Sequence, residues 1–99
     1  MYVRVAIAEI KPGMLDELSE EMIRNFEAGV ALATPIPGFL GHQFMISHES
    51  NKMAIISRWT TQADELANRQ GNVQQQSATL ANYFAGRPAI EVFEVRFEV

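Results

Sequence analysis

Residues 39–59, FLGHQFMISHESNKMAIISRW, decide the fold of this chain. Two apolar runs, Phe39 to His48 and Met53 to Trp59, flank the polar segment Glu49-Ser50-Asn51-Lys52. Polar residues of these types favour a turn, and apolar and aromatic runs on either side of a turn favour strands. The stretch therefore predicts a β-hairpin of two antiparallel strands.

The residues before the hairpin predict a strand and then a long helix. The first ten residues alternate between two largely apolar faces, with Val3, Val5 and Ile7 on one and Tyr2, Arg4, Ala6, Ala8 and Ile10 on the other. Lys11-Pro12-Gly13 ends this strand, because proline cannot donate to a strand ladder. Apolar residues then recur every three or four positions, at Leu15, Leu18, Met22, Phe26, Val30 and Ala33. This period indicates a helix from Met14 of about 20 residues, which Pro35-Ile36-Pro37-Gly38 ends.

The residues after the hairpin predict two shorter helices. Thr61 and Asp64 have the spacing of an N-cap and its N3 carboxylate, and the apolar residues of the helix that follows are Ala63, Leu66 and Ala67. We expect Gly71 to interrupt this helix and Asn72 to cap the next one. The apolar stripe of that third helix is Val73, Ser77, Leu80 and Phe84, and Gly86-Arg87-Pro88 ends it.

A last strand from Ile90 to Val99, with Phe93, Val95, Phe97 and Val99 on one face, completes the order β-α-β-β-α(α)-β. We expect one α+β domain, residues 1–99, with the ferredoxin-like split βαβ fold and an antiparallel four-stranded sheet. Its helices cover one face of the sheet, while the first and last strands carry an apolar second face. Each such side chain left in water forgoes about 1.5–3 kcal/mol. We therefore predict an isologous homodimer in which two sheets pack face to face in a barrel-like arrangement.

Composition and charge exclude several classes of function. The chain has 12 acidic and 8 basic side chains and no basic cluster, so we expect no nucleic-acid partner. It has no cysteine, and His42 and His48 lie roughly 20 Å apart along one strand, too far to share a metal ion. We expect no metal and no other cofactor. We also expect no membrane partner and a cytoplasmic location, because no long uncharged run occurs.

Three segments carry a resemblance to a known family: Lys11-Pro12-Gly13 before a long acidic helix, Pro37-Gly38-Phe39-Leu40-Gly41 at the second strand, and Arg58-Trp59-Thr60-Thr61 after the third. In this order they resemble the antibiotic biosynthesis monooxygenase family of the dimeric α+β barrel superfamily. The resemblance covers nearly the whole chain and implies a homodimer. Some members oxygenate polycyclic phenols without metal or flavin, and others degrade haem.

The residues that define the characterised branches of this family are absent. The Asn, Trp and His of the haem-degrading branch correspond here to Ala6, Asn68 and the vicinity of Ser77, and the Asn and Tyr of the quinone-forming branch to Ile55 and Glu65. Two hypotheses therefore stand. The chain is a cofactor-independent monooxygenase acting on a small flat aromatic or phenolic compound, or a homodimer on the same scaffold that binds a small apolar or aromatic molecule without catalysis.

Three residues are candidates for catalysis. His42 could act as a base, since an imidazole exchanges a proton near neutral pH, or it could be an ordinary histidine on a wet strand face. Trp59 could stack on a flat ligand and donate its indole N–H, or it could pack beneath a helix. Tyr83 could be a phenolic acid, or it could anchor a helix to the sheet.

Two further residues are candidates for substrate binding. Arg4 shares a face with small alanines, and a guanidinium there suits an anionic or enolate-like ligand; alternatively it forms a cross-strand ion pair with Glu94 or Glu98. Asn68, next to Arg69, could line the mouth of a cavity or could be solvated.

Overall fold

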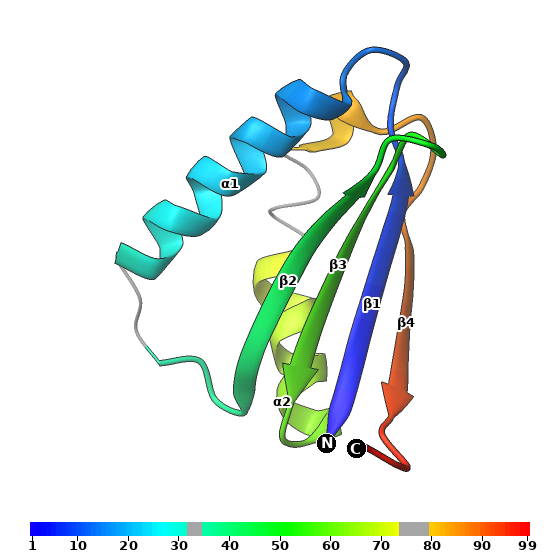
Figure 1. Ribbon diagram of the computed structural model, residues 1–99. Helices are drawn as coiled ribbons and strands as arrows, with labels where there is room; N and C mark the ends of the chain where they lie inside the picture. Colours follow the sequence, from blue (N-terminus) through cyan, green and yellow to red (C-terminus); the bar gives the residue numbers. More distant parts are fainter. Residues whose placement is uncertain (32–34, 74–79) are drawn as a thin grey trace.

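The computed structural model describes residues 1–31, 35–73 and 80–99 (Figure 1). Its strands are β1 (Tyr2–Glu9), β2 (Phe39–Ser47), β3 (Lys52–Trp59) and β4 (Ala89–Glu94). Its helices are α1 (Leu15–Ala31), α2 (Gln62–Asn68), a π-helical turn η1 (Arg69–Val73) and a 3-10 turn η2 (Ala81–Tyr83). The strands form one antiparallel sheet in the order β2-β3-β1-β4. The ferredoxin-like α+β fold predicted from the sequence is thereby confirmed.

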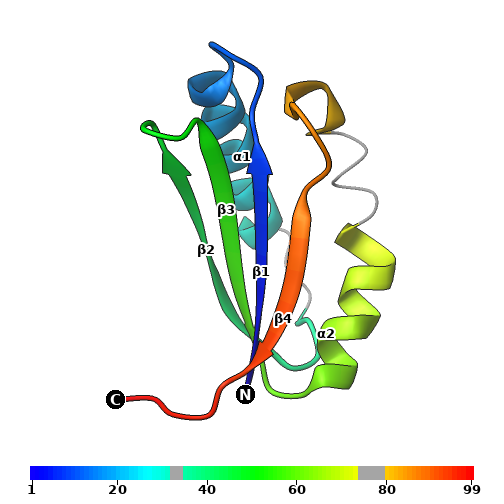
Figure 2. The same cartoon turned by 90° about the vertical axis from the view of Figure 1, so that its right-hand side faces the viewer.

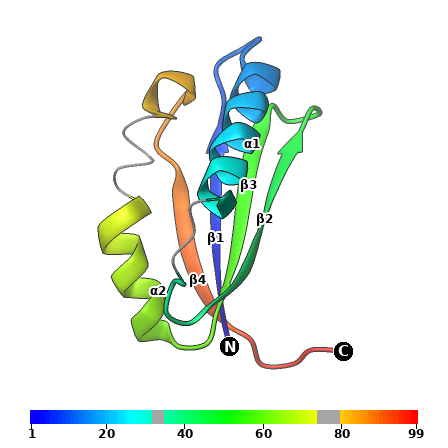
Figure 3. The same ribbon diagram turned by 90° about the vertical axis from the view of Figure 1, so that its left-hand side faces the viewer.

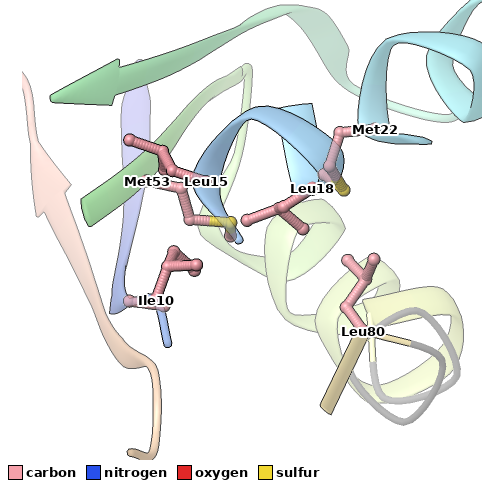
Figure 4. Close-up of a cluster of buried hydrophobic side chains, with 7 residues drawn as sticks. Ile10, Leu15, Leu18, Met22, Met53 and Leu80 are labelled. Atoms are coloured by element: carbon pink, nitrogen blue, oxygen red, sulfur yellow. The ribbon is translucent and has the colours of Figure 1, made fainter. Parts of the chain in front are cut away.

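Helix α1 packs on one face of the sheet through the apolar stripe that the sequence predicts. Leu15, Leu18 and Met22 are buried; Val30 and Ala33 lie outside the residues whose side chains are described. The other members of this buried cluster lie in β1, just after it, in β3 and just before η2, and they are Ala8, Ile10, Met53 and Leu80 (Figure 4). Burying each large side chain contributes about 1.5–3 kcal/mol, so this cluster fixes α1 on the sheet.

The opposite face of the sheet is largely apolar, and no helix of the described residues covers it. Figure 2 shows this face with α1 behind the strands, and Figure 3 shows α1 in front of them. Val3 on β1 lies opposite Phe93 on β4, and Phe93 is 49% exposed. Ile7 and Met45 are exposed on this face as well. The predicted alternation of β1 is therefore confirmed, since Arg4, Ala8 and Ile10 belong to the helix-covered face.

The last strand is shorter than predicted. It ends at Glu94, not at Val99. Glu94 pairs with Tyr2 at the edge of β1, and the N–H of Val95 donates to the carbonyl oxygen of Met1 at 2.9 Å. The ladder thus ends where β1 ends, and Phe97 beyond it is 83% exposed.

Helix α2 begins as predicted, and its buried residue is polar. The Thr61 side chain accepts a hydrogen bond from the N–H of Asp64 at 3.1 Å, which confirms the N-cap. The apolar residues of this helix are exposed, and they are Ala63, Leu66 and Ala67. Glu65 is buried instead. An ion pair with a distant strand, and not an apolar stripe, directs this helix toward the sheet.

The expected break at Gly71 and cap at Asn72 are also wrong, because both residues belong to the π-helical turn η1, which continues from α2. Most of the predicted third helix lies outside the described residues, and its described part is the turn η2. Across the described residues, no helix has the length and apolar character required to span a membrane.

Candidate functional site

A buried polar cluster joins α2 to β1. Glu65 is 0% exposed, and its Oε2 lies 3.1 Å from Nη1 of Arg4 and 3.1 Å from Nε of Arg69. Nη2 of Arg4 donates to Oδ1 of Asn68 at 3.1 Å. The N-cap at Thr61 sets the start of α2, and the helical period then places Glu65, Asn68 and Arg69 on the same side. The cluster brings the predicted residues Arg4 and Asn68 together.

Arg4 binds a partner that the sequence did not indicate. Among the described residues its ion pair is with Glu65, not with Glu94 or Glu98, so the predicted cross-strand pair is wrong. Arg4 lies on the helix-covered face, where α2 brings a carboxylate within reach, whereas Glu94 pairs with Tyr2 farther along the strand. Burial lowers the pKa of Arg4, and the hydrogen bond with Glu65 opposes that change.

The ring of Trp59 packs against the guanidinium group of Arg4 in this cluster. The guanidinium carbon of Arg4 lies 5.3 Å from the centre of the Trp59 ring. The indole N–H donates to Oγ of Ser57 at 2.9 Å, and both Trp59 and Ser57 are buried. The indole donor is therefore directed to Ser57, and the ring supports Arg4 instead of facing solvent.

His42 lies on the same face of the sheet as Trp59. It pairs across β2 and β3 with Ser57, and it is exposed. Its ring centre lies 4.5 Å from that of Phe26 on α1 and 5.6 Å from that of Phe39. Phe39 in turn lies 5.3 Å from Trp59. His42 is thus a solvent-accessible imidazole set among flat apolar rings.

A β-bulge makes this arrangement possible. Residues three apart on a regular strand face opposite sides, yet Phe39 and His42 pair with Trp59 and Ser57, which share a face. The register shifts between Phe39 and Gly41, and Gly41 has a φ of 130°, a conformation that favours glycine. The bulge therefore brings a second aromatic ring beside His42.

Tyr83 lies apart from the other predicted site residues. Its hydroxyl donates to Oε2 of Glu21 on α1, and its carbonyl accepts from the N–H of Lys11, past the end of β1. Ile10, the residue before Lys11, is six residues from Arg4 along the extended chain, so Tyr83 and Arg4 are roughly 20 Å apart. The hydrogen bond to Glu21 raises the pKa of Tyr83 to about 12. The structure thus shows Tyr83 fastening η2 to α1.

Sequence reasoning missed Ser57 and Glu65 as members of the site. A serine between two large residues of β3 indicates a polar contact inside the sheet face, and that was the available signal for Ser57. Glu65 gives no local signal, because its partner Arg4 is 61 residues away. In the part of the chain that the structure describes, no three His, Asp or Glu side chains gather as metal ligands.

Solved structures share this arrangement over almost the whole chain. A monooxygenase from the gene ActVA-Orf6 of Streptomyces coelicolor, in complex with nanaomycin D, matches with a TM-score of 0.78 at 16% identity, covering 99% of this chain and 89% of that one. A structure described as an antibiotic biosynthesis monooxygenase matches with a TM-score of 0.66 at 15% identity, covering 96% and 98%. This chain has the antibiotic biosynthesis monooxygenase fold.

The same fold occurs in an MhuD variant with two manganese protoporphyrin IX molecules bound per active site. That structure matches with a TM-score of 0.70 at 22% identity and covers 100% of this chain and 98% of that one. No protein-family model matches the sequence, and no curated protein matches it. The shared fold confirms the resemblance drawn from the sequence segments. A fold does not determine a reaction, so the reaction has to be argued from the site.

Proposed function

We propose that this chain is a homodimeric monooxygenase that uses neither metal nor flavin and acts on a small, flat phenolic compound. The observation that carries the proposal is the placement of His42, an exposed imidazole between the rings of Phe26 and Phe39. Flat rings favour a flat ligand, and an imidazole is the side chain best suited to exchange a proton near neutral pH. Two structures with the same fold contain nanaomycin D and manganese protoporphyrin IX, and this supports a flat ligand.

In the proposed reaction His42 takes the phenolic proton of an anthrone-type substrate. The electron-rich ring then reduces dioxygen and forms a carbon–oxygen bond at its CH2 position. Loss of water from the resulting hydroperoxide leaves a carbonyl, so one oxygen atom of dioxygen ends in the quinone and the other in water. The substrate supplies the electrons. The guanidinium groups of Arg4 and Arg69 favour the negative charge that develops on the ring.

The homodimer is proposed from the exposed apolar face of the sheet. Val3, Val5 and Ile7 lie on this face of β1, beside Phe93 on β4. Two copies packed through this face would remove these side chains from water and leave the His42 side of each sheet free. Sedimentation equilibrium at micromolar concentration tests the dimer: we expect about twice the 11.1 kDa mass of one chain. A stable species of one chain mass would contradict the dimer.

Oxygen uptake tests the reaction. The wild-type protein is mixed with a panel of hydroquinones and anthrones, and dioxygen consumption and quinone formation are followed. His42→Ala should lower the rate about 10²- to 10⁴-fold, the usual contribution of a general base. His48→Ala is the matched control, since His48 is exposed and follows the last residue of β2. Undiminished turnover in His42→Ala would contradict the proposed base.

The same experiment separates catalysis from binding alone. Under the alternative hypothesis, panel compounds raise the melting temperature but are recovered unchanged by mass spectrometry. Quinone product that depends on His42 would rule out this alternative.

A further inference from the structure

Among the described residues, two buried polar atoms at the centre of the polar cluster have no hydrogen-bond partner. They are Oε1 of Glu65, an acceptor, and Nε of Arg69, a donor. Nε of Arg69 lies 3.1 Å from the other oxygen of the same carboxylate without satisfying hydrogen-bond geometry to it. A buried polar atom without a partner destabilises the protein by about the free energy of desolvating it. Both atoms are therefore expected to bind a molecule that the protein itself does not supply.

We infer that Glu65 and Arg69 form a hydroxyl-binding site for the proposed phenolic substrate, an inference that rests on the proposed function. One hydroxyl group satisfies both atoms, since its O–H donates to Oε1 of Glu65 while its oxygen accepts from Nε of Arg69. The two atoms are close enough for this because Nε already lies beside Oε2 of the same carboxylate. The side chain of Arg69 is 36% exposed, whereas Glu65 is fully buried and Nε of Arg69 is buried as well.

Charge selects a neutral hydroxyl over other groups. Two guanidinium groups, those of Arg4 and Arg69, face the single carboxylate of Glu65, so the cluster carries an excess positive charge. An ammonium group could donate to Oε1 but would be repelled by that excess. A carboxylate or phenolate is attracted by the excess but has no proton to donate to Oε1. A hydroxyl carries no charge and presents both a donor and an acceptor.

This hydroxyl is distinct from the one that His42 deprotonates. Arg4 pairs with Ser57, and Ser57 pairs with His42 on the next strand. Neighbouring strands are about 4.8 Å apart, so the backbones of Arg4 and His42 are about 10 Å apart, and the two residues occupy separate positions on the sheet. We therefore expect the substrate to carry a second hydroxyl, apart from the one that His42 deprotonates.

Isothermal titration calorimetry in the absence of dioxygen tests this site on the intact protein. The probes are 2-naphthol, its methyl ether 2-methoxynaphthalene, and the ammonium analogue 2-(aminomethyl)naphthalene. The wild type should bind 2-naphthol about ten- to a hundredfold more tightly than the ether, the range expected for a hydrogen bond to a charged group. The ammonium compound should bind more weakly than 2-naphthol.

Variants separate this site from His42. His42→Ala should keep the preference for 2-naphthol over the ether, whereas Glu65→Gln should reduce it to about threefold or less. Glu20→Gln is the matched control, because Glu20 is exposed on α1, and it should keep the full preference. Circular dichroism checks that each variant is folded. Where Glu65→Gln does not fold, the comparison of wild type with His42→Ala still decides whether the preference for 2-naphthol is independent of His42.

The outcomes separate the two proposals. Equal wild-type affinity for 2-naphthol and its ether would overturn the hydroxyl site and leave the proposed reaction standing. Loss of the preference in His42→Ala, or tighter binding of the ammonium compound, would also overturn the site. A preference that depends on Glu65, combined with no oxygen uptake on any substrate, would support the site and overturn the proposed reaction. If neither naphthalene compound binds, the hydroxyl site is wrong, and oxygen uptake on the hydroquinones and anthrones decides the proposed reaction.

Discussion

Removing the guanidinium of Arg4 should destabilise the fold strongly, and removing its carboxylate partner at the same time should restore most of that stability. Arg4→Met keeps the unbranched stem of the side chain but deletes the donors to Glu65 and Asn68 and the cation above Trp59. It leaves a fully buried carboxylate held by Arg69 alone. The double variant Arg4→Met/Glu65→Leu leaves no buried carboxylate.

The magnitude follows from the burial of the pair. Breaking a buried ion pair by removing one partner costs about 3–5 kcal/mol, because a buried charge is left uncompensated. Arg69 still compensates part of the charge of Glu65, so we expect about 3 kcal/mol for Arg4→Met. Replacing both partners by apolar residues is often neutral, so the double variant should lose about 1 kcal/mol or less. For a domain of this size, about 3 kcal/mol corresponds to roughly 12–24 °C in melting temperature.

Urea unfolding followed by fluorescence measures these differences, since Trp59 is the sole tryptophan and lies against Arg4. The protein concentration must be the same for all variants, because the stability of a dimer depends on it. The measured quantity is the coupling energy of the double-mutant cycle. A double variant that loses as much stability as the two single variants combined would refute a buried, coupled ion pair at this position.

Three further substitutions test the local structure. Thr61→Ala should lower the free energy of unfolding by about 1 kcal/mol, measured in urea, because the N–H of Asp64 loses its acceptor; no change would contradict the cap. Gly38→Ala should lower the melting temperature, since Gly38 has a φ of 73° and an added Cβ would lie 2.7 Å from Cβ of Asp64; a stability equal to wild type would contradict this geometry. Tyr83→Phe should be less stable than wild type below pH 10 and should lose this deficit as the pH rises to 12, because the hydrogen bond to Glu21 raises the pKa of Tyr83 from 10.0 to about 12 and that stabilisation disappears when the phenol ionises. Urea unfolding of both proteins from pH 8 to pH 12 checks the sign, and a deficit that persists unchanged at pH 12 would contradict it.

The fold could be predicted because its signals are local. The alternation of β1, the period of α1, the hairpin turn and the N-cap at Thr61 each depend on residues close in sequence, and the structure confirms them. The end of β4 at Glu94 could not be predicted, because alternation continues to Val99 while pairing depends on the edge of another strand. The alternation of residues shows that a segment can form a strand, and the length of that strand depends on the strand with which it pairs.

The site was predictable only in part, for the same physical reason. His42 and Arg4 stand out as polar residues in apolar strands, and both lie on the helix-covered face. The position of Phe39 beside His42 depends on a bulge, which shifts the alternation and makes residues three apart share a face. Glu65 depends on an ion pair across 61 residues, and the sequence shows it only as a residue that departs from the family.

Helix α2 contradicts the rule that apolar residues face the core, and the contradiction itself indicates function. Leu66 is exposed while Glu65, the next residue, is fully buried. A buried ion pair contributes little or nothing to stability relative to apolar residues of similar size, so stability does not explain the presence of Glu65 opposite Arg4. Departures of this kind concentrate at functional sites. The double variant Arg4→Met/Glu65→Leu should therefore fold nearly as well as wild type while losing the preference for 2-naphthol over its methyl ether. A folded double variant that keeps the preference would show that the ion pair has no part in binding.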